Sequence, residues 1–182
     1  MKLMIASDIH GSAFWCRKLL GRFEDEAAER LVLLGDLLYH GPRNDLPDEY
    51  DPKAVLRMLK EMSDRILCVR GNCDSEVDQM VLNFPILAEY AVLFTDGLTL
   101  YCVHGHKLSG NGIEYLRPGD ILLQGHTHIP QCAESEGFLR LNPGSVSIPK
   151  QDSPHGYMTL ENGVFHWKNL ESGEVWQKHR PN

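Results

Sequence analysis

Short apolar runs, each followed by polar residues, recur along the chain. The clearest are LMIA at 3–6, LVLL at 31–34, ILCV at 66–69, LTLYCV at 98–103 and ILLQ at 121–124. Each run is rich in Leu, Ile and Val and is flanked by turn residues, which is typical of buried β-strands. The pattern predicts a strand at each of these positions.

Helices are predicted between the first three strands. Ser12 stands where an N-cap is expected, just before an apolar stripe with helical spacing. In the next helical segment, Pro52 suits the first turn after Asp51, and a short third helix is expected to begin at Ser75. The two stripes consist of Cys16, Leu19, Leu20 and Phe23, and of Val55, Leu59 and Met62.

The pattern changes in the last third of the chain. Residues 131–142 and 156–179 contain Gly-bearing turns such as ENGV and ESGE, which predict antiparallel hairpins. Strand–helix–strand alternation in the first half predicts parallel strands there and an α/β fold. Because the 182 residues show no linker or repeat, we expect a single domain spanning residues 1–182.

Composition narrows the classes of function. With 42% hydrophobic and 24% charged residues, the chain is typical of a soluble globular protein. Its net charge of −7 argues against a broad nucleic-acid surface, which needs clustered Lys and Arg. The five cysteines form no C-x-x-C pair, which favours a reducing compartment. The N-terminal apolar run is too short for a signal peptide, and no stretch reaches the ~18 apolar residues of a membrane span, so we expect a cytoplasmic protein with no membrane partner.

A side chain that can bind metal stands within a few residues of the end of each apolar run. These side chains are Asp8, His10, Asp36, Asn72, His104, His126 and His128. Parallel strands bring their carboxyl ends to one edge of a sheet, where ligands bind in open α/β folds. Side chains at i and i+2 of an extended segment point the same way, so Asp8 and His10 are expected to coordinate the same cation. The pair His126 and His128 is expected to do the same.

Seven such ligands exceed what one ion needs. Zinc usually takes four ligands, and octahedral first-row ions take six including water. Two cations about 4 Å apart that share a carboxylate fit the number better, and such pairs hold both the attacking and the leaving oxygen of a phosphoryl transfer. Oxygen donors mixed with imidazole suit Mn, Fe, Zn, Ni or Co.

The order and spacing of these residues resemble a known signature. The matching segments are DIH at 8–10, GD at 35–36, GNCD at 71–74, His104 and GHTH at 125–128. Together they are similar to the motifs of the calcineurin-like metallophosphoesterases. The segments GDLLYHGPRN, RGNCDSEVDQM and NPGSVSIPK further resemble bacterial phosphodiesterases of that family, so the resemblance covers nearly the whole chain.

The resemblance implies a four-layer αββα sandwich, in which two mixed β-sheets are flanked by helices. It also implies a small phosphodiester as substrate and manganese as the usual metal, and homo-oligomers are common among such proteins. The implied ligand sets are Asp8, His10 and His128 for one cation and Asn72, His104 and His126 for the other, with Asp36 bridging them.

Three further residues are candidates for the site. Many members of the family carry histidine after the Asn ligand, where this chain has Cys73. A thiol with a pKa near ~8.5 is a weaker acid catalyst at neutral pH than an imidazolium. His40 and Arg43 lie in a long polar loop and are expected to grip phosphate oxygens. Cys73 and His40 are thus candidate catalytic residues, and His40 and Arg43 candidate substrate-binding residues. The alternatives are backbone capping for His40 and a surface salt bridge for Arg43.

Two other functions stay open at the level of the sequence. A catalytically weak or inactive Vps29-like scaffold would use the same fold to bind protein partners, although the complete ligand set favours an enzyme. A metal hydrolase of C–N bonds would also use paired histidines. Asn72 is an unusual ligand for such a site, however, and the chain offers no candidate for a metal-bridging lysine.

Overall fold

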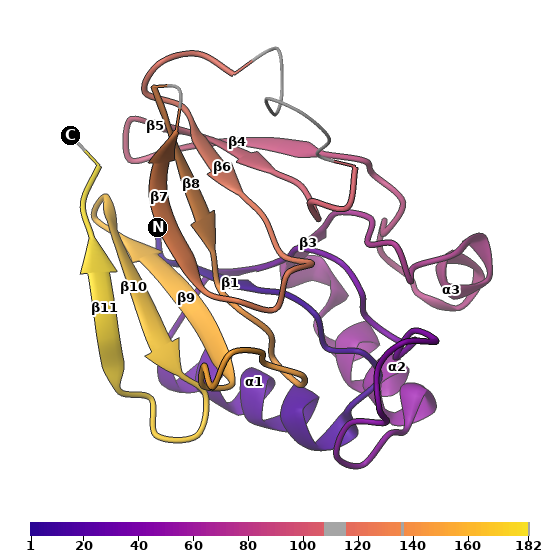
Figure 1. Cartoon of the computed structure of the whole chain (residues 1–182). Helices are drawn as coiled ribbons and strands as arrows, with labels where there is room; N and C mark the ends of the chain where they lie inside the picture. The colour runs from indigo at the N-terminus through magenta and orange to yellow at the C-terminus, as the bar shows by residue number, and fades with distance from the viewer. Residues whose placement is uncertain (108–115, 136, 182) are drawn as a thin grey trace.

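Two mixed β-sheets pack face to face in the computed structural model, which describes residues 1–107, 116–135 and 137–181 (Figure 1). One sheet contains, in spatial order, β11 (Val175–His179), β10 (Val164–Asn169), β9 (Gly156–Glu161), β1 (Leu3–Ala6), β2 (Arg30–Leu33) and β3 (Ile66–Cys68). The other contains β4 (Ala91–Thr95), β5 (Leu98–Cys102), β6 (Ile121–Leu123), β8 (Phe138–Asn142) and β7 (Gln131–Ser135). This sandwich of two mixed sheets confirms the expected fold class.

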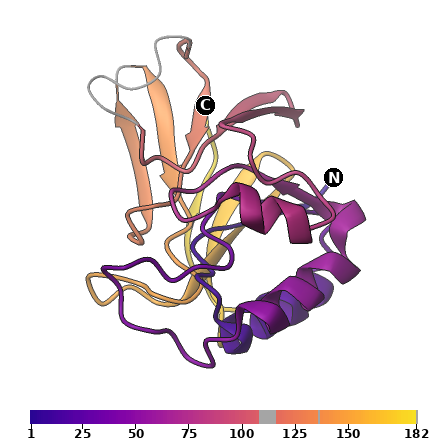
Figure 2. The same ribbon diagram turned by 90° about the vertical axis from the view of Figure 1, so that its right-hand side faces the viewer.

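Helices α1 (Ala13–Asp25) and α2 (Pro52–Glu61) lie on the outer face of the six-stranded sheet, as the two views in Figures 1 and 2 show. Both begin where the sequence predicts, because the Ser12 hydroxyl accepts the Trp15 N–H and the Asp51 carboxylate accepts the Ala54 N–H. The short helix α3 (Glu76–Val81) starts with a capping box in which Ser75 is the N-cap. No helix in the described part of the chain is long and apolar enough to cross a membrane.

The core has two apolar layers on either side of β1. Met4 and Ala6 pack toward the helices, whereas Leu3 and Ile5 face the five-stranded sheet. Since successive side chains of a strand point to opposite faces, a strand buried on both faces must be apolar at every position. This burial explains the unbroken apolar run LMIA.

Three strands in each sheet run parallel and end in register. In the six-stranded sheet, Ala6 of β1 pairs with Leu33 of β2, which pairs with Cys68 of β3. In the five-stranded sheet, β5, β6 and β8 are likewise parallel and pair through Cys102, Leu123 and Leu141. The segments that follow these six strands are therefore brought to one edge of the sandwich.

The remaining strands are antiparallel. The predicted hairpins β7–β8, β9–β10 and β10–β11 are confirmed. Strand β4 was not among the predicted strands; it pairs antiparallel with β5 at the sheet edge and is only partly buried. The segment AVLF at 91–94 is nevertheless an apolar run, and the Asp96-Gly97 turn joins it to β5, so the signal for this hairpin was present in the sequence and was overlooked.

Candidate metal centre

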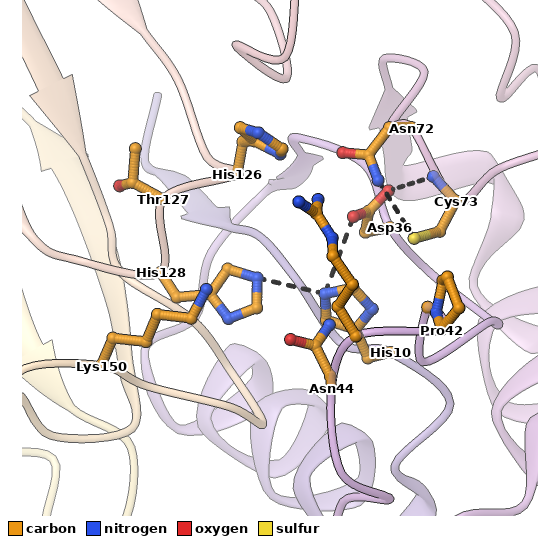
Figure 3. A pocket seen from close by; sticks show the side chains of 12 residues that line it. His10, Asp36, Pro42, Asn44, Asn72, Cys73, His126, Thr127, His128 and Lys150 are labelled. Carbon is orange, nitrogen blue, oxygen red and sulfur yellow. Dashed lines mark hydrogen bonds and ion pairs between the residues drawn. The ribbon is translucent and has the colours of Figure 1, made fainter.

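The seven predicted ligands converge at the edge where the parallel strands end, and Figure 3 shows five of them, namely His10, Asp36, Asn72, His126 and His128. Asp8 and His10 follow β1, Asp36 follows β2 and Asn72 follows β3. From the facing sheet, His104 follows β5, and His126 and His128 follow β6. The site therefore forms between the sheets, at the position expected for a crevice outside the carboxyl ends of parallel strands.

Five of the seven residues have a left-handed backbone. Their φ angles are 61° for Asp8, 49° for His10, 58° for Asp36, 66° for His126 and 61° for His128. The expectation that the i, i+2 pairs are extended was therefore wrong. Non-glycine residues rarely adopt this conformation, and it costs about 1 kcal/mol or more each. Such strain persists where the surrounding structure fixes the backbone, and it concentrates at functional sites.

The first group of ligands consists of Asp8, His10 and His128. Asp8 Oδ1 lies 3.5 Å from His10 Nε2 and 3.3 Å from His128 Nε2. The two histidine Nε2 atoms are 3.2 Å apart. All three side chains are buried, and one ligand atom of each lies within 4.8 Å of the others, which is a suitable arrangement for a cation.

The second group forms around His104. His104 Nε2 is 3.3 Å from Asp36 Oδ2 and 3.1 Å from Asn72 Oδ1, and the His126 ring lies 5.1 Å from the His104 ring. Asp36 Oδ2 is also 3.7 Å from His10 Nε2, so this carboxylate lies between the two groups. His126 and the nearby His128 thus contact different groups and do not act as a single pair.

Backbone carbonyls orient the three buried imidazoles. An Nδ1–H group directed at a carbonyl oxygen leaves the Nε2 lone pair free, which is the usual arrangement around a metal-binding histidine. The Asp8 Oδ1 atom is also buried with no hydrogen-bond donor among the described residues. These features fit divalent cations. The contacts are His10 Nδ1 to Tyr39 O at 2.8 Å, His104 Nδ1 to Leu34 O at 2.6 Å and His128 Nδ1 to Ile148 O at 2.6 Å.

Comparison with known proteins places this geometry in a family. Residues 1–163 match the model of the calcineurin-like phosphoesterase superfamily domain. The chain is a calcineurin-like phosphoesterase. Phosphodiesterase YfcE of Escherichia coli strain K12 is 46% identical to it over 165 residues, covering 91% of this chain and 90% of YfcE. The fold of this family implies divalent metal ions, in agreement with the grouping of Asp and His ligands.

Solved structures agree with this placement. The structure of the E. coli phosphoesterase YfcE superposes with a TM-score of 0.95 and 42% identity over the whole of both chains. Vps29 from Entamoeba histolytica matches with a TM-score of 0.69 and 23% identity over the whole of both chains. The second likeness shows a shared fold and nothing more.

The charges of the phosphoesterase centre hold its carboxylates ionised. Burial acts to raise the pKa of Asp8, but contacts with His10 and His128 outweigh it and hold that pKa well below its usual range. Burial likewise opposes protonation of His104, yet its contact with Asp36 raises the His104 pKa to about 9. Each carboxylate thus draws positive charge to the centre, either as a proton on imidazole or as a cation.

Asp74, which sequence reasoning did not single out, holds the loops of the centre together. Its buried carboxylate accepts the backbone N–H groups of Asp36 at 2.8 Å, Leu37 at 2.9 Å and Gly71 at 2.7 Å. The loops after β2 and β3 are thereby fixed to each other. The signal available in the sequence was its place in the GNCD segment, two residues after Asn72.

A second support comes from the loop after β8. The hydroxyls of Ser145 and Ser147 both donate to the Asp8 carbonyl at 3.0 Å. Gly125, before His126, lets the loop after β6 approach this region closely, because a Cβ there would lie 1.9 Å from Ser7 Oγ. The ligand segments are therefore held by contacts from both sheets.

An open cavity of about 440 Å³ lies over the centre. Arg43 and Cys73, two of the predicted substrate and catalytic residues, line it. His40 is not among the lining residues; its ring packs edge-on against Tyr39 and Tyr50. The structure therefore gives no support to a substrate contact by His40. The full lining consists of His10, Asp36, Gly41, Pro42, Arg43, Asn44, Asn72, Cys73, His126, Thr127, His128 and Lys150.

Proposed function

We propose that this protein is a metal-dependent phosphodiesterase whose centre holds two divalent cations. The observation that carries the proposal is the place of Asp36, whose Oδ2 lies between His10 Nε2 and His104 Nε2 at 3.7 and 3.3 Å. A carboxylate placed between two ligand groups is suited to being shared by two cations. The 46% identity to a phosphodiesterase over most of the chain supports the same reaction.

The proposed ligands fall into the two groups described above. When bound, a cation pair supplies an activated water at neutral pH and neutralises charge on the phosphate. The chain itself contributes the orientation of the imidazoles and the ionised carboxylates. The assignment is Asp8, His10 and His128 for one cation, Asn72, His104 and His126 for the other, and Asp36 for both.

Arg43 and Cys73 are proposed to contact the substrate. The Arg43 guanidinium lines the cavity and is suited to bidentate contact with phosphate oxygens. Burial and the negative charge of Asp36 raise the pKa of the Cys73 thiol to about 12, and we propose that the protonated thiol donates a weak hydrogen bond to a departing oxygen. The proposed catalytic and substrate-binding roles of His40 have no cavity contact to support them; its carbonyl accepts the Asn44 side-chain N–H at 2.7 Å, which ties His40 into the loop through its backbone.

The identity of the metal, the compartment, the extent of the domain and the oligomeric state are also proposals. Manganese is proposed as the metal because mixed oxygen and imidazole ligands accept it, with Fe, Zn, Ni and Co as alternatives. The five free cysteines favour a reducing compartment, and we propose that the protein acts in the cytoplasm. We further propose one catalytic domain over residues 1–182, a small phosphodiester as partner, and a homo-oligomer as a state to be tested.

The decisive experiment is metal reconstitution of the purified protein. Metal-depleted protein should regain hydrolysis of bis(p-nitrophenyl) phosphate with Mn²⁺ and bind two cations per chain by elemental analysis. A matched set of phosphomonoesters should react more slowly. If no divalent metal restores turnover while the fold is intact, the protein is better explained as a binding scaffold of the kind the Vps29 fold permits.

A further inference from the structure

The cavity carries more positive charge than one phosphodiester requires. A diester group bears a single negative charge, and that charge together with the Asp8 and Asp36 carboxylates and an ionised water would balance two divalent cations. Arg43 and Lys150 add two more cationic side chains to the cavity wall. A substrate with neutral arms would offer no anionic partner to the second of these side chains.

Lys150 is free to meet a substrate. Its side chain is exposed and lines the cavity, and Figure 3 shows it beside His128. Among the residues that the structure describes, no ion pair joins Lys150 to an acid, whereas Lys2 and Lys168, far from the cavity, both pair with Glu26.

The backbone of Lys150 is fixed to the metal centre. Its N–H donates to the His128 carbonyl at 3.2 Å, and its carbonyl accepts the Ser153 N–H at 3.2 Å and the Ser153 hydroxyl at 2.7 Å. The His128 ring is in turn held by the Ile148 carbonyl. The Lys150 backbone is thus held beside His128, and its flexible side chain carries the ammonium group into the cavity, within reach of one arm of a bound substrate.

We propose that Lys150 binds a second anionic group on the substrate, so that the preferred substrates are phosphodiesters with a further phosphate on one arm. This inference rests on the proposed phosphodiesterase function and names its substrate class. Arg43 is assigned to the reacting phosphate and Lys150 to the additional one. A Lys ammonium acts as a point charge toward phosphate and can follow modest differences in arm length.

The test compares two substrates that differ by one phosphate. These are the p-nitrophenyl ester of thymidine 5′-phosphate and the same ester carrying a 3′-phosphate. Wild-type protein loaded with Mn²⁺ should favour the second by about tenfold in kcat/KM, which corresponds to ~1.4 kcal/mol. Lys150→Ala should abolish this preference and Lys150→Arg should keep it, while Arg43→Ala should slow both substrates. Lys60→Ala removes an equal charge from the exposed end of α2 and should change neither.

Binding provides a readout that does not depend on turnover. Calorimetric titration should show thymidine 3′,5′-bisphosphate binding about tenfold more tightly than thymidine 5′-phosphate, with the difference lost in Lys150→Ala. Equal kcat/KM values for the two esters in wild type would overturn the anionic-arm site and leave the phosphodiesterase function standing. A preference that survives in Lys150→Ala would overturn the assignment to Lys150. Failure to hydrolyse either ester would instead reject the phosphodiesterase function itself.

Discussion

Asp36 and His104 connect the two sheets at the metal centre, with Asp36 Oδ2 lying 3.3 Å from His104 Nε2. Asp36 follows β2 in one sheet and His104 follows β5 in the other. The same carboxylate lies 3.7 Å from His10 Nε2. Because Asp36 reaches both ligand groups, its charge matters more to the centre than that of any ligand confined to one group.

Replacing Asp36 with Asn should therefore abolish function and leave the fold intact. Removing a group that merely orients a metal ligand lowers activity by up to about 100-fold. Asp36 is itself a shared ligand, so its loss should lower kcat/KM by at least about 100-fold. Elemental analysis should find fewer than two cations per chain. Asp25→Asn changes an exposed carboxylate at the end of α1 and is the matched control, with activity close to wild type. Full activity in Asp36→Asn would exclude a bridging role.

Gly71 allows the loop after β3 to approach Asp36. A Cβ at this position would lie 2.0 Å from Asp36 Oδ1 and 2.4 Å from the Asp36 backbone nitrogen. Gly71→Ala should therefore displace the carboxylate, weaken cation binding by about tenfold or more, and destabilise the protein by about 1–3 kcal/mol. Calorimetric cation titration and urea unfolding would measure the two effects.

Gly21 offers the opposite case for comparison. It lies within α1, and a Cβ there would meet nothing within 4 Å. Gly21→Ala should stabilise the protein by about 0.5–1 kcal/mol, because glycine is costly inside a helix, and should leave cation affinity unchanged. If both alanine variants behaved alike, the close approach at Gly71 would not be what shapes the centre.

Cys73 replaces the histidine expected from the family resemblance, and this change should appear in leaving-group dependence. A protonated thiol donates weakly to a departing oxygen, so Cys73→Ala should slow aryl diesters with good leaving groups by only a few-fold and poorer ones by more. The measurement is kcat/KM across a series of substituted phenyl leaving groups. A Cys73→Ala defect that is the same for every leaving group would rule out a donor role at that oxygen.

The position of the site was predictable from sequence because it depends on chain order. Asp8, Asp36 and His104 each follow an apolar run, and parallel strands bring such ends together. The left-handed backbone of Asp8 was not predictable, since it is imposed by contacts such as those of Ser145 and Ser147 from a distant loop. Local pattern carries no information on such contacts.

Residues that act through long-range contacts were also missed. Asp74 is recognisable as important only once its three backbone partners are known. Lys150 faces the cavity only because the loop between β8 and β9 folds over the end of β6. Conversely, His40 looked suited to the site in sequence, but its ring packs against Tyr39 and Tyr50. A long loop can turn either way, and the sequence alone does not determine which of its polar side chains face inward.

Glu26 should govern the acid stability of the fold away from the centre. It follows α1 and accepts a hydrogen bond from Tyr157 of β9 at 2.9 Å, while Lys2 lies 2.8 Å away and Lys168 of β10 also pairs with it. Burial acts to raise the pKa of Glu26, but the contacts with Lys168 and Lys2 outweigh it and lower the pKa to about 2. The helix end is thereby joined to two strands of the six-stranded sheet, β9 and β10, and to the N-terminal segment before β1.

The sign of the pH dependence follows from this lowered pKa. Since the folded protein binds the Glu26 proton more weakly than the unfolded chain, the stabilisation is full above about pH 4.5 and is lost as the pH falls toward 2. Glu26→Gln should cost about 1–3 kcal/mol at pH 7, and its deficit relative to wild type should shrink between pH 5 and pH 2 in urea unfolding. Glu24→Gln, which alters an exposed ion pair with Arg65, should cost under about 1 kcal/mol at any pH. A Glu26→Gln deficit that stays constant with pH would show that packing, and not charge, secures the end of α1.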